Sequence, residues 1–90
     1  MMPSPEAWVL QIDPSVLKRI QRLPEADARR IATVVKLLPQ NPFFGDIQKM
    51  KGEENVWRRR IGSYRLFFKL YPGKRLLLVF HLERRTSTTY

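Results

Sequence analysis

Residues 55–70 have the sequence NVWRRRIGSYRLFFKL, which contains the pattern that decides the fold. Two runs rich in aromatic and aliphatic residues, 56–61 and 64–71, are separated by Gly62-Ser63, as is typical of two strands joined by a short turn. Four arginines and one lysine lie inside these runs. Since a strand of a small sheet buries one of its faces, the question is which face carries the arginines.

Side-chain alternation separates the three adjacent arginines. Successive residues of a strand point to opposite faces, so Arg58 and Arg60 share one face, and Arg59 shares the other with Trp57 and Ile61. Trp57 and Ile61 require burial, which predicts that Arg58 and Arg60 lie on the uncovered face. Arg59 then either extends past the edge of the covering layer or lies at the margin of the sheet.

The same alternation in 64–71 predicts a second apolar set that faces the core, namely Tyr64, Leu66, Phe68 and Leu70. The other face of this strand receives Arg65, Phe67, Lys69 and Tyr71. Arg65 is therefore expected to join Arg58 and Arg60, with aromatic rings between the cations.

The remaining elements complete an α+β domain. Asp13-Pro14 predicts the start of a helix, because Asp caps helix N-termini and Pro suits the first position. Periodicity and turn signals predict strands at 8–12, 47–51 and 75–83 and a second helix at 25–38. We expect an N-terminal strand and an antiparallel helix pair, with the helices on one face of a mostly antiparallel four-stranded sheet in one domain, 1–90.

Charge and composition narrow the function. The net charge is +9, with 6 basic and 4 acidic residues in 1–45 and 11 basic and 4 acidic in 46–90. A concentrated positive field favours a polyanionic partner such as nucleic acid. Cysteine is absent and there is one histidine, so we expect no disulfide, no metal and no cofactor. We also expect no membrane segment and no signal peptide, and therefore a cytoplasmic protein.

An uncovered sheet face with arginines and aromatic rings is suited to single-stranded RNA. Guanidinium groups bind phosphate with two parallel hydrogen bonds, and aromatic rings stack on bases. The alternative is a solvated polar face whose arginines pair with Glu53, Glu54 or Glu83.

The central residues resemble a known family. Lys51-Gly52, followed by Val56-Trp57-Arg58-Arg59-Arg60-Ile61-Gly62-Ser63-Tyr64-Arg65-Leu66, is similar to the signature of the RelE/ParE toxin superfamily. Glu83-Arg84-Arg85-Thr86 and the terminal Tyr90 are similar to the basic cluster and terminal tyrosine of RelE-type toxins.

This resemblance implies a toxin with a cognate acidic antitoxin, a RelE-type protein that enters the ribosome and cleaves mRNA without metal. It implies that Arg58 and Arg60 occupy positions where RelE-type toxins have lysines and that Arg65 is the phosphate-binding arginine. It also implies that Arg84 or Arg85 is the C-terminal catalytic arginine and that Tyr90 stacks on a base.

The sequence departs from that pattern at the group that accepts a proton. Arginine keeps its proton, so Lys49 or Lys51 would have to replace the missing lysine, or catalysis would rest on electrostatics and positioning by the ribosome. Lys69 is a further candidate for substrate binding, and His81 is interpreted as a strand residue near the end of a hairpin.

Two other functions remain open from the sequence. A ParE-like protein would inhibit DNA gyrase without catalysing a reaction itself. A catalytically weak relative would retain only RNA binding, as the arginines at lysine positions suggest.

Overall fold

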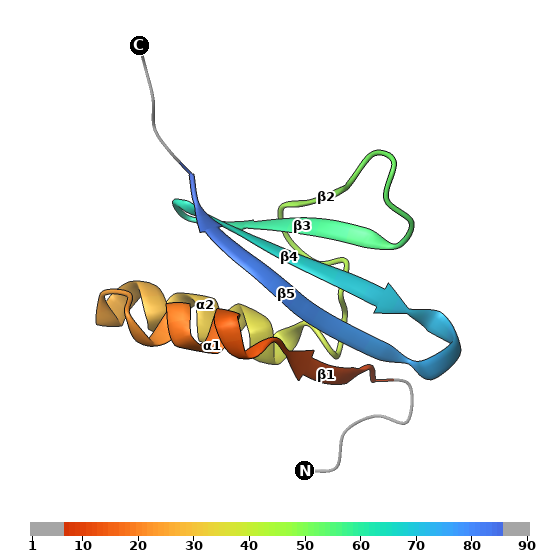
Figure 1. Ribbon diagram of the computed structural model, residues 1–90, viewed down its shortest axis with the longest axis horizontal. Coiled ribbons are helices and arrows are strands. Elements are labelled where there is room, and N and C mark those ends of the chain that lie inside the picture. The colour runs from red at the N-terminus through yellow and green to blue at the C-terminus, as the bar shows by residue number, and fades with distance from the viewer. Residues whose placement is uncertain (1–6, 86–90) are drawn as a thin grey trace.

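Two helices and a twisted sheet form the two layers of the fold (Figure 1). The computed structural model describes residues 7–85. Its elements are β1 (Val9–Ile12), α1 (Pro14–Gln21), α2 (Glu25–Leu37), β2 (Ile47–Lys49), β3 (Val56–Ile61), β4 (Tyr64–Tyr71), the short 3₁₀ helix η1 (Pro72–Lys74) and β5 (Leu76–Arg84). Neither α-helix in this part of the chain has the length and apolarity of a membrane-spanning segment.

The sheet has five strands in the order β1-β5-β4-β3-β2. β1 pairs in parallel with β5, and the other neighbours are antiparallel. The predicted α+β class is therefore confirmed, and the predicted count of four strands is corrected to five. Both the N-terminal strand and the three-residue β2 join the sheet, one at each edge.

Local sequence signals start and stop the helices. Asp13 caps α1, because its Oδ1 accepts a hydrogen bond from the Ser15 amide at 2.9 Å, and Pro14 fills the first helical position. α2 begins directly after Pro24, so the two helices run antiparallel beneath the sheet (Figure 1).

The core lies between the helices and one face of the sheet. Both layers contribute side chains with 0% exposure: Ile31 on α2 and Leu38 directly after it, and Leu66, Phe68, Leu77 and Val79 on the strands. Tyr64 joins the layers, since its hydroxyl donates to Asp27 Oδ2 on α2 at 3.0 Å. Within residues 7–85 no element covers the other side of the sheet, which we call the open face (Figure 1).

A β-bulge in β5 changes which residues reach the open face. Phe68 pairs with Val79 and Phe67 pairs with His81, so Phe80 is an extra residue. Because β4 places Phe67 on the open face, the bulge brings both Phe80 and His81 there and returns Leu82 to the core at 3% exposure. Strict alternation from Val79 would have turned His81 toward the helices.

Arg59 lies on the helix side of the sheet, as predicted. It pairs with Ile47 and Leu66, and its guanidinium lies 4.2 Å from the centre of the Phe44 ring while donating to the Phe44 carbonyl at 2.9 Å. Partial burial lowers the pKa of Arg59, and the negative charge of Asp46 opposes this. The cation is thus held by the loop before β2 and contributes to the fold, not to the open face.

Candidate nucleic-acid interface

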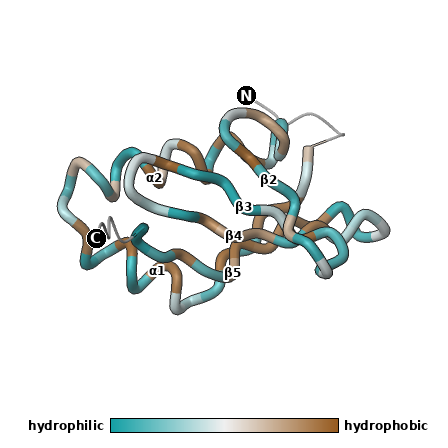
Figure 2. The backbone as a smooth tube through the Cα atoms, turned by 90° about the horizontal axis from the view of Figure 1, so that it is seen from above, coloured by the Kyte–Doolittle hydropathy of each residue, from teal (hydrophilic) through white to brown (hydrophobic). Residues whose placement is uncertain are grey.

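Residues that pair across β3, β4 and β5 form rows on the open face, which we call cross-strand rows. Arg60, Arg65 and Glu83 form the first row; Arg58, Phe67 and His81 the second; Val56, Lys69 and Leu78 the third. Successive rows are two residues apart along β4, which corresponds to about 6.7 Å. The face therefore changes from charged to more apolar along the strands. Across the strands, the middle of β3 is hydrophilic and β5 is largely apolar (Figure 2).

The predicted grouping of Arg58, Arg60 and Arg65 on the open face is confirmed by the strand register. Arg58 donates to the Gln48 side chain, Arg60 Nε lies 3.8 Å from Asp46 Oδ2, and Arg65 Nη1 lies 3.1 Å from Glu83 Oε2. These contacts are at least partly solvent-exposed, where an ion pair contributes about 0–1 kcal/mol. An incoming phosphate can therefore compete for the guanidinium groups.

Glu83 links Arg65 to His81 at the centre of the face. One carboxylate oxygen accepts from Arg65, and the other lies 3.1 Å from His81 Nε2. The hydrogen bond with His81 has the largest influence and lowers the pKa of Glu83; burial opposes it, and the hydrogen bond with Arg65 lowers the pKa further. The His81 ring also lies 5.4 Å from the Phe67 ring, tilted by 49°. His81 is thus oriented by a carboxylate on one side and an aromatic ring on another.

The alternative was a solvated polar face whose arginines pair with Glu53, Glu54 or Glu83, and it holds for Glu83 alone among residues 7–85. Glu83 pairs with Arg65, whereas Glu53 and Glu54 form no ion pair among residues 7–85. Neither Glu83 nor His81 was among the sequence-predicted site residues. The signal that could have found them is the His-x-Glu spacing, because residues i and i+2 of a strand share a face.

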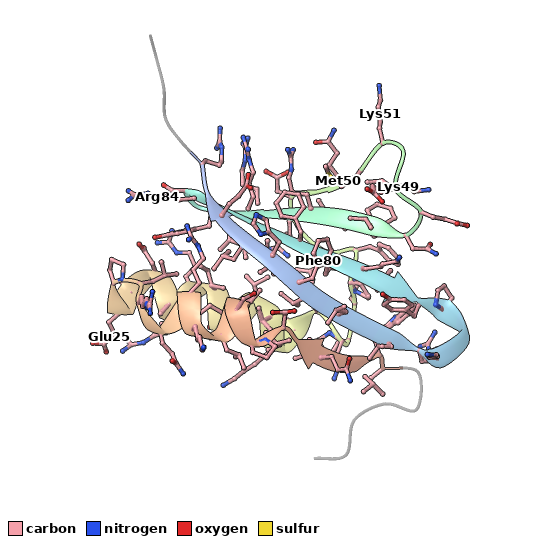
Figure 3. The ribbon with its side chains drawn as sticks, viewed as in Figure 1. Glu25, Lys49, Met50, Lys51, Phe80 and Arg84 are labelled. Atoms are coloured by element: carbon pink, nitrogen blue, oxygen red, sulfur yellow. The ribbon has the colours of Figure 1, made fainter. Side chains whose placement is uncertain are left out.

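The two C-terminal arginines lie on different faces. Arg84 pairs with Tyr64 and, on the helix side, lines a groove of about 720 Å³ with Lys18, Arg19 and Arg22; Figure 3 shows it at the end of the sheet near the turn between the helices. The Arg85 amide donates to the Ser63 carbonyl at 2.5 Å, which continues the β4–β5 ladder. Alternation therefore directs Arg85 to the face of Glu83 and Arg65. Tyr90 lies outside the described residues.

The three lysines are spread over the molecule. Lys49 pairs with Trp57, so it lies on the helix side at the sheet edge, on the opposite face from Arg60; the prediction that it replaces the missing lysine stays a prediction. Lys51 is in the loop after β2 and extends away from the helices (Figure 3). Lys69 lies on the open face, with its Nζ 5.2 Å from the centre of the Tyr71 ring.

We expect the Glu83 carboxylate to titrate below its ordinary value of 4.5, because its ionised form accepts the bonds from His81 and Arg65. A lowered folded-state pKa means that the pair stabilises the fold above that ordinary value and that this stability is lost as pH falls through the folded pKa. An NMR titration of the carboxyl carbon checks this. In His81→Ala the midpoint should move up toward 4.5, while Arg29→Ala on α2 should leave it in place; a wild-type midpoint at or above 4.5 contradicts the geometry.

Comparison with known proteins gives consistent likenesses. No family model matches the chain. A curated protein of Methanocaldococcus jannaschii, named "Putative toxin RelE1", is 28% identical over 79 residues, which cover 84% of this chain and 88% of that protein. The archaeal RelE–RelB complex from Pyrococcus horikoshii contains a chain with a TM-score of 0.80 at 24% identity, covering 91% of this chain and 99% of that one. The isolated E. coli RelE toxin gives 0.77 at 16% identity, covering 91% and 88%.

The two layers and the strand order thus define the class of protein, a small α+β protein with the fold of the RelE toxins. The residues around Trp57 that resemble the RelE/ParE signature and the likeness to the curated RelE1 protein agree with this fold. The chain therefore has the fold of the RelE toxins and is similar in sequence to one curated RelE1 protein over most of its length.

Proposed function

We propose that this protein is the toxin of a toxin–antitoxin pair and acts as a ribosome-dependent mRNA endonuclease. The observation that carries the proposal is the Arg65–Glu83–His81 network on an open face that also holds Arg58 and Arg60. It joins groups that bind phosphate to a group that can accept a proton. The names of the similar proteins, RelE toxins with RelB antitoxins, support the toxin role.

The proposed reaction is an internal transfer at phosphorus. The 2′-oxygen of a ribose attacks the adjacent phosphate, its proton passes to a base, and the bond between phosphorus and the 5′-oxygen breaks. The leaving 5′-oxygen receives a proton, so the products carry a 2′,3′-cyclic phosphate and a 5′-hydroxyl. The protein must therefore supply positive charge to the crowded phosphate, a proton acceptor and a proton donor.

Arginines supply the charge in this proposal. Arg65 binds the scissile phosphate, and Arg60, which lies opposite it in β3, shares the developing negative charge. Arg58 and Lys69 hold neighbouring phosphates, and Arg85, not Arg84, is the C-terminal arginine that stabilises or protonates the leaving oxygen. Lys51 remains a candidate for substrate binding, and a role for Tyr90 in stacking on a base is kept from the family resemblance.

His81 is the proton acceptor in this proposal. An ionised carboxylate accepts a hydrogen bond, so Glu83 keeps the hydrogen of His81 on Nε2 and leaves a lone pair on Nδ1 of the neutral ring. Glu83 itself is the weaker base, because its two partners lower its pKa. Glu83 therefore orients His81, and the face does not depend on a lysine at the position of Arg60.

The partner that would silence this face is an acidic antitoxin. A chain with a net charge of +9 attracts acidic proteins as it attracts RNA. A segment rich in Asp and Glu laid over the arginines would exclude the message. Toxin and ribosome would meet in the cytoplasm.

A translating extract tests the proposal. We expect purified protein to cut message in ribosome-bound form, leaving 2′,3′-cyclic phosphate and 5′-hydroxyl ends, and to leave naked message intact. A parallel supercoiling assay with DNA gyrase should show full activity. Intact message together with inhibited gyrase would overturn the proposal and favour a ParE-like function.

A further inference from the structure

The apolar end of the open face contains a cavity next to the arginines. Its volume is about 460 Å³, and the third cross-strand row, with Val56 and Leu78, lines it together with Tyr71. Phe67, Phe80 and His81 line it on the side of the second row, toward the arginines. Figure 3 shows Phe80 on β5 and Met50 just after β2, two strand regions that both contribute lining residues.

We propose that this cavity binds one unstacked RNA base, from a nucleotide whose phosphate is held by the arginines of the first two rows. The inference rests on the proposed function, which supplies the RNA, and adds a base-binding site formed by Phe67 and Phe80. Neither residue has a role in the reaction described above.

The first argument for a base at this site is that the cavity adjoins the arginines of the open face. Arg58 lies directly opposite Phe67, and Arg65 lies two residues before it on β4 at about 6.7 Å along the strand. His81 lines the cavity and is bonded to Glu83, which is bonded to Arg65. A phosphate on these arginines therefore places its own or the adjacent base at the cavity.

The second argument is the arrangement of the two phenylalanine rings that line the cavity. The Phe67 and Phe80 ring centres are 6.4 Å apart with planes tilted by 48°, so neither ring covers the face of the other. Aromatic faces that do not pair with each other are what a base stacks on, and such stacking does not require a particular base. Alternation from Val79 already directs Phe80 to the open face, and the bulge places His81 there beside it.

The chemistry of the surroundings favours a nucleotide over a purely apolar ligand. The cavity is apolar, yet Lys69 lines it and Arg58 and Arg65 border it. A ligand with a flat ring at one end and a phosphate at the other satisfies both halves of this surface.

Binding of short RNA separates this inference from cleavage. The probe is a fluorescent RNA oligonucleotide with 2′-O-methyl groups, which cannot be cut, compared with versions that carry one abasic residue at each position in turn. At fixed low salt and without ribosomes, one abasic position should weaken binding by about 5- to 150-fold, the range expected for one stacked base. All probes carry the same charge, so phosphate contacts do not produce the difference.

Phe80→Ala should remove this difference and leave the affinity for the abasic probe unchanged. Leu17→Ala, which truncates an exposed apolar side chain on α1, is the matched control and should keep the difference. Equal affinity for intact and abasic probes in the wild type, or no binding of either, overturns the inference even if message is cleaved. If Phe80→Ala weakens binding of the antitoxin but not binding of the RNA probes, the cavity binds protein, and this result also overturns the inference.

Discussion

Arg65→Ala should lower the single-turnover rate of message cleavage by about 10²–10³-fold, the cost of removing one charged donor from a developing oxyanion. Arg65 is central on the open face, with Arg60 opposite it in β3 and Glu83 opposite it in β5. Its loss removes the proposed phosphate ligand and also one of the two hydrogen bonds that hold Glu83. Primer extension on ribosome-bound message in a translating extract measures the rate.

Arg29→Ala is the matched control for this prediction. It removes the same charge from α2, where Arg29 forms an exposed pair with Glu25 worth at most about 0.5 kcal/mol. Arg65→Lys should be intermediate, because lysine keeps the charge but not the two-pronged geometry. Wild-type cleavage by Arg65→Ala, or an equal loss in Arg29→Ala, would show that net charge and not the open face determines activity. Thermal unfolding of all three variants identifies any loss of structure.

The positions of these arginines could be predicted because β3 and β4 are regular strands. Val56–Ile61 and Tyr64–Tyr71 have the predicted bounds, and their apolar residues determine which face is buried. Once Trp57 and Ile61 face the helices, the faces of Arg58, Arg60 and Arg65 follow from a period of two. No long-range information was needed for this part of the site.

The environment of His81 could not be predicted in the same way. Its face depends on one extra residue in β5, and a bulge has no dependable signal in a run of apolar residues. The faces of Lys49 and Arg84 depend on the pairing register between strands, which turn geometry sets and composition does not. Arg59 depends on a loop that packs Phe44 beneath its guanidinium.

These differences alter the chemical interpretation of the face. From the sequence, the surface consisted of permanent cations, so the proton acceptor had to be a lysine elsewhere or absent. The structure adds one carboxylate and one imidazole to that surface, in hydrogen-bond contact. Electrostatic stabilisation by Arg65 and proton transfer by His81 can then act on one phosphate from adjacent cross-strand rows.

His81→Ala should therefore reduce the cleavage rate by about 10²–10⁴-fold, the usual contribution of a positioned acid or base. Binding to ribosomes should change little, because all the arginines remain. The rate is measured in single turnovers with ribosomes in excess, and binding by cosedimentation at the same salt concentration.

His81→Gln distinguishes proton transfer from positioning. A glutamine amide can donate to Glu83 as His81 does, so it can hold the carboxylate and Arg65 in place, but it cannot accept a proton. If His81 is the base, both variants lose cleavage to a similar extent. Restored cleavage in His81→Gln would contradict the assignment, because the role would then be to orient Glu83 and Arg65. Catalysis would in that case rest on the cations of the open face and on the geometry that the ribosome imposes on the message.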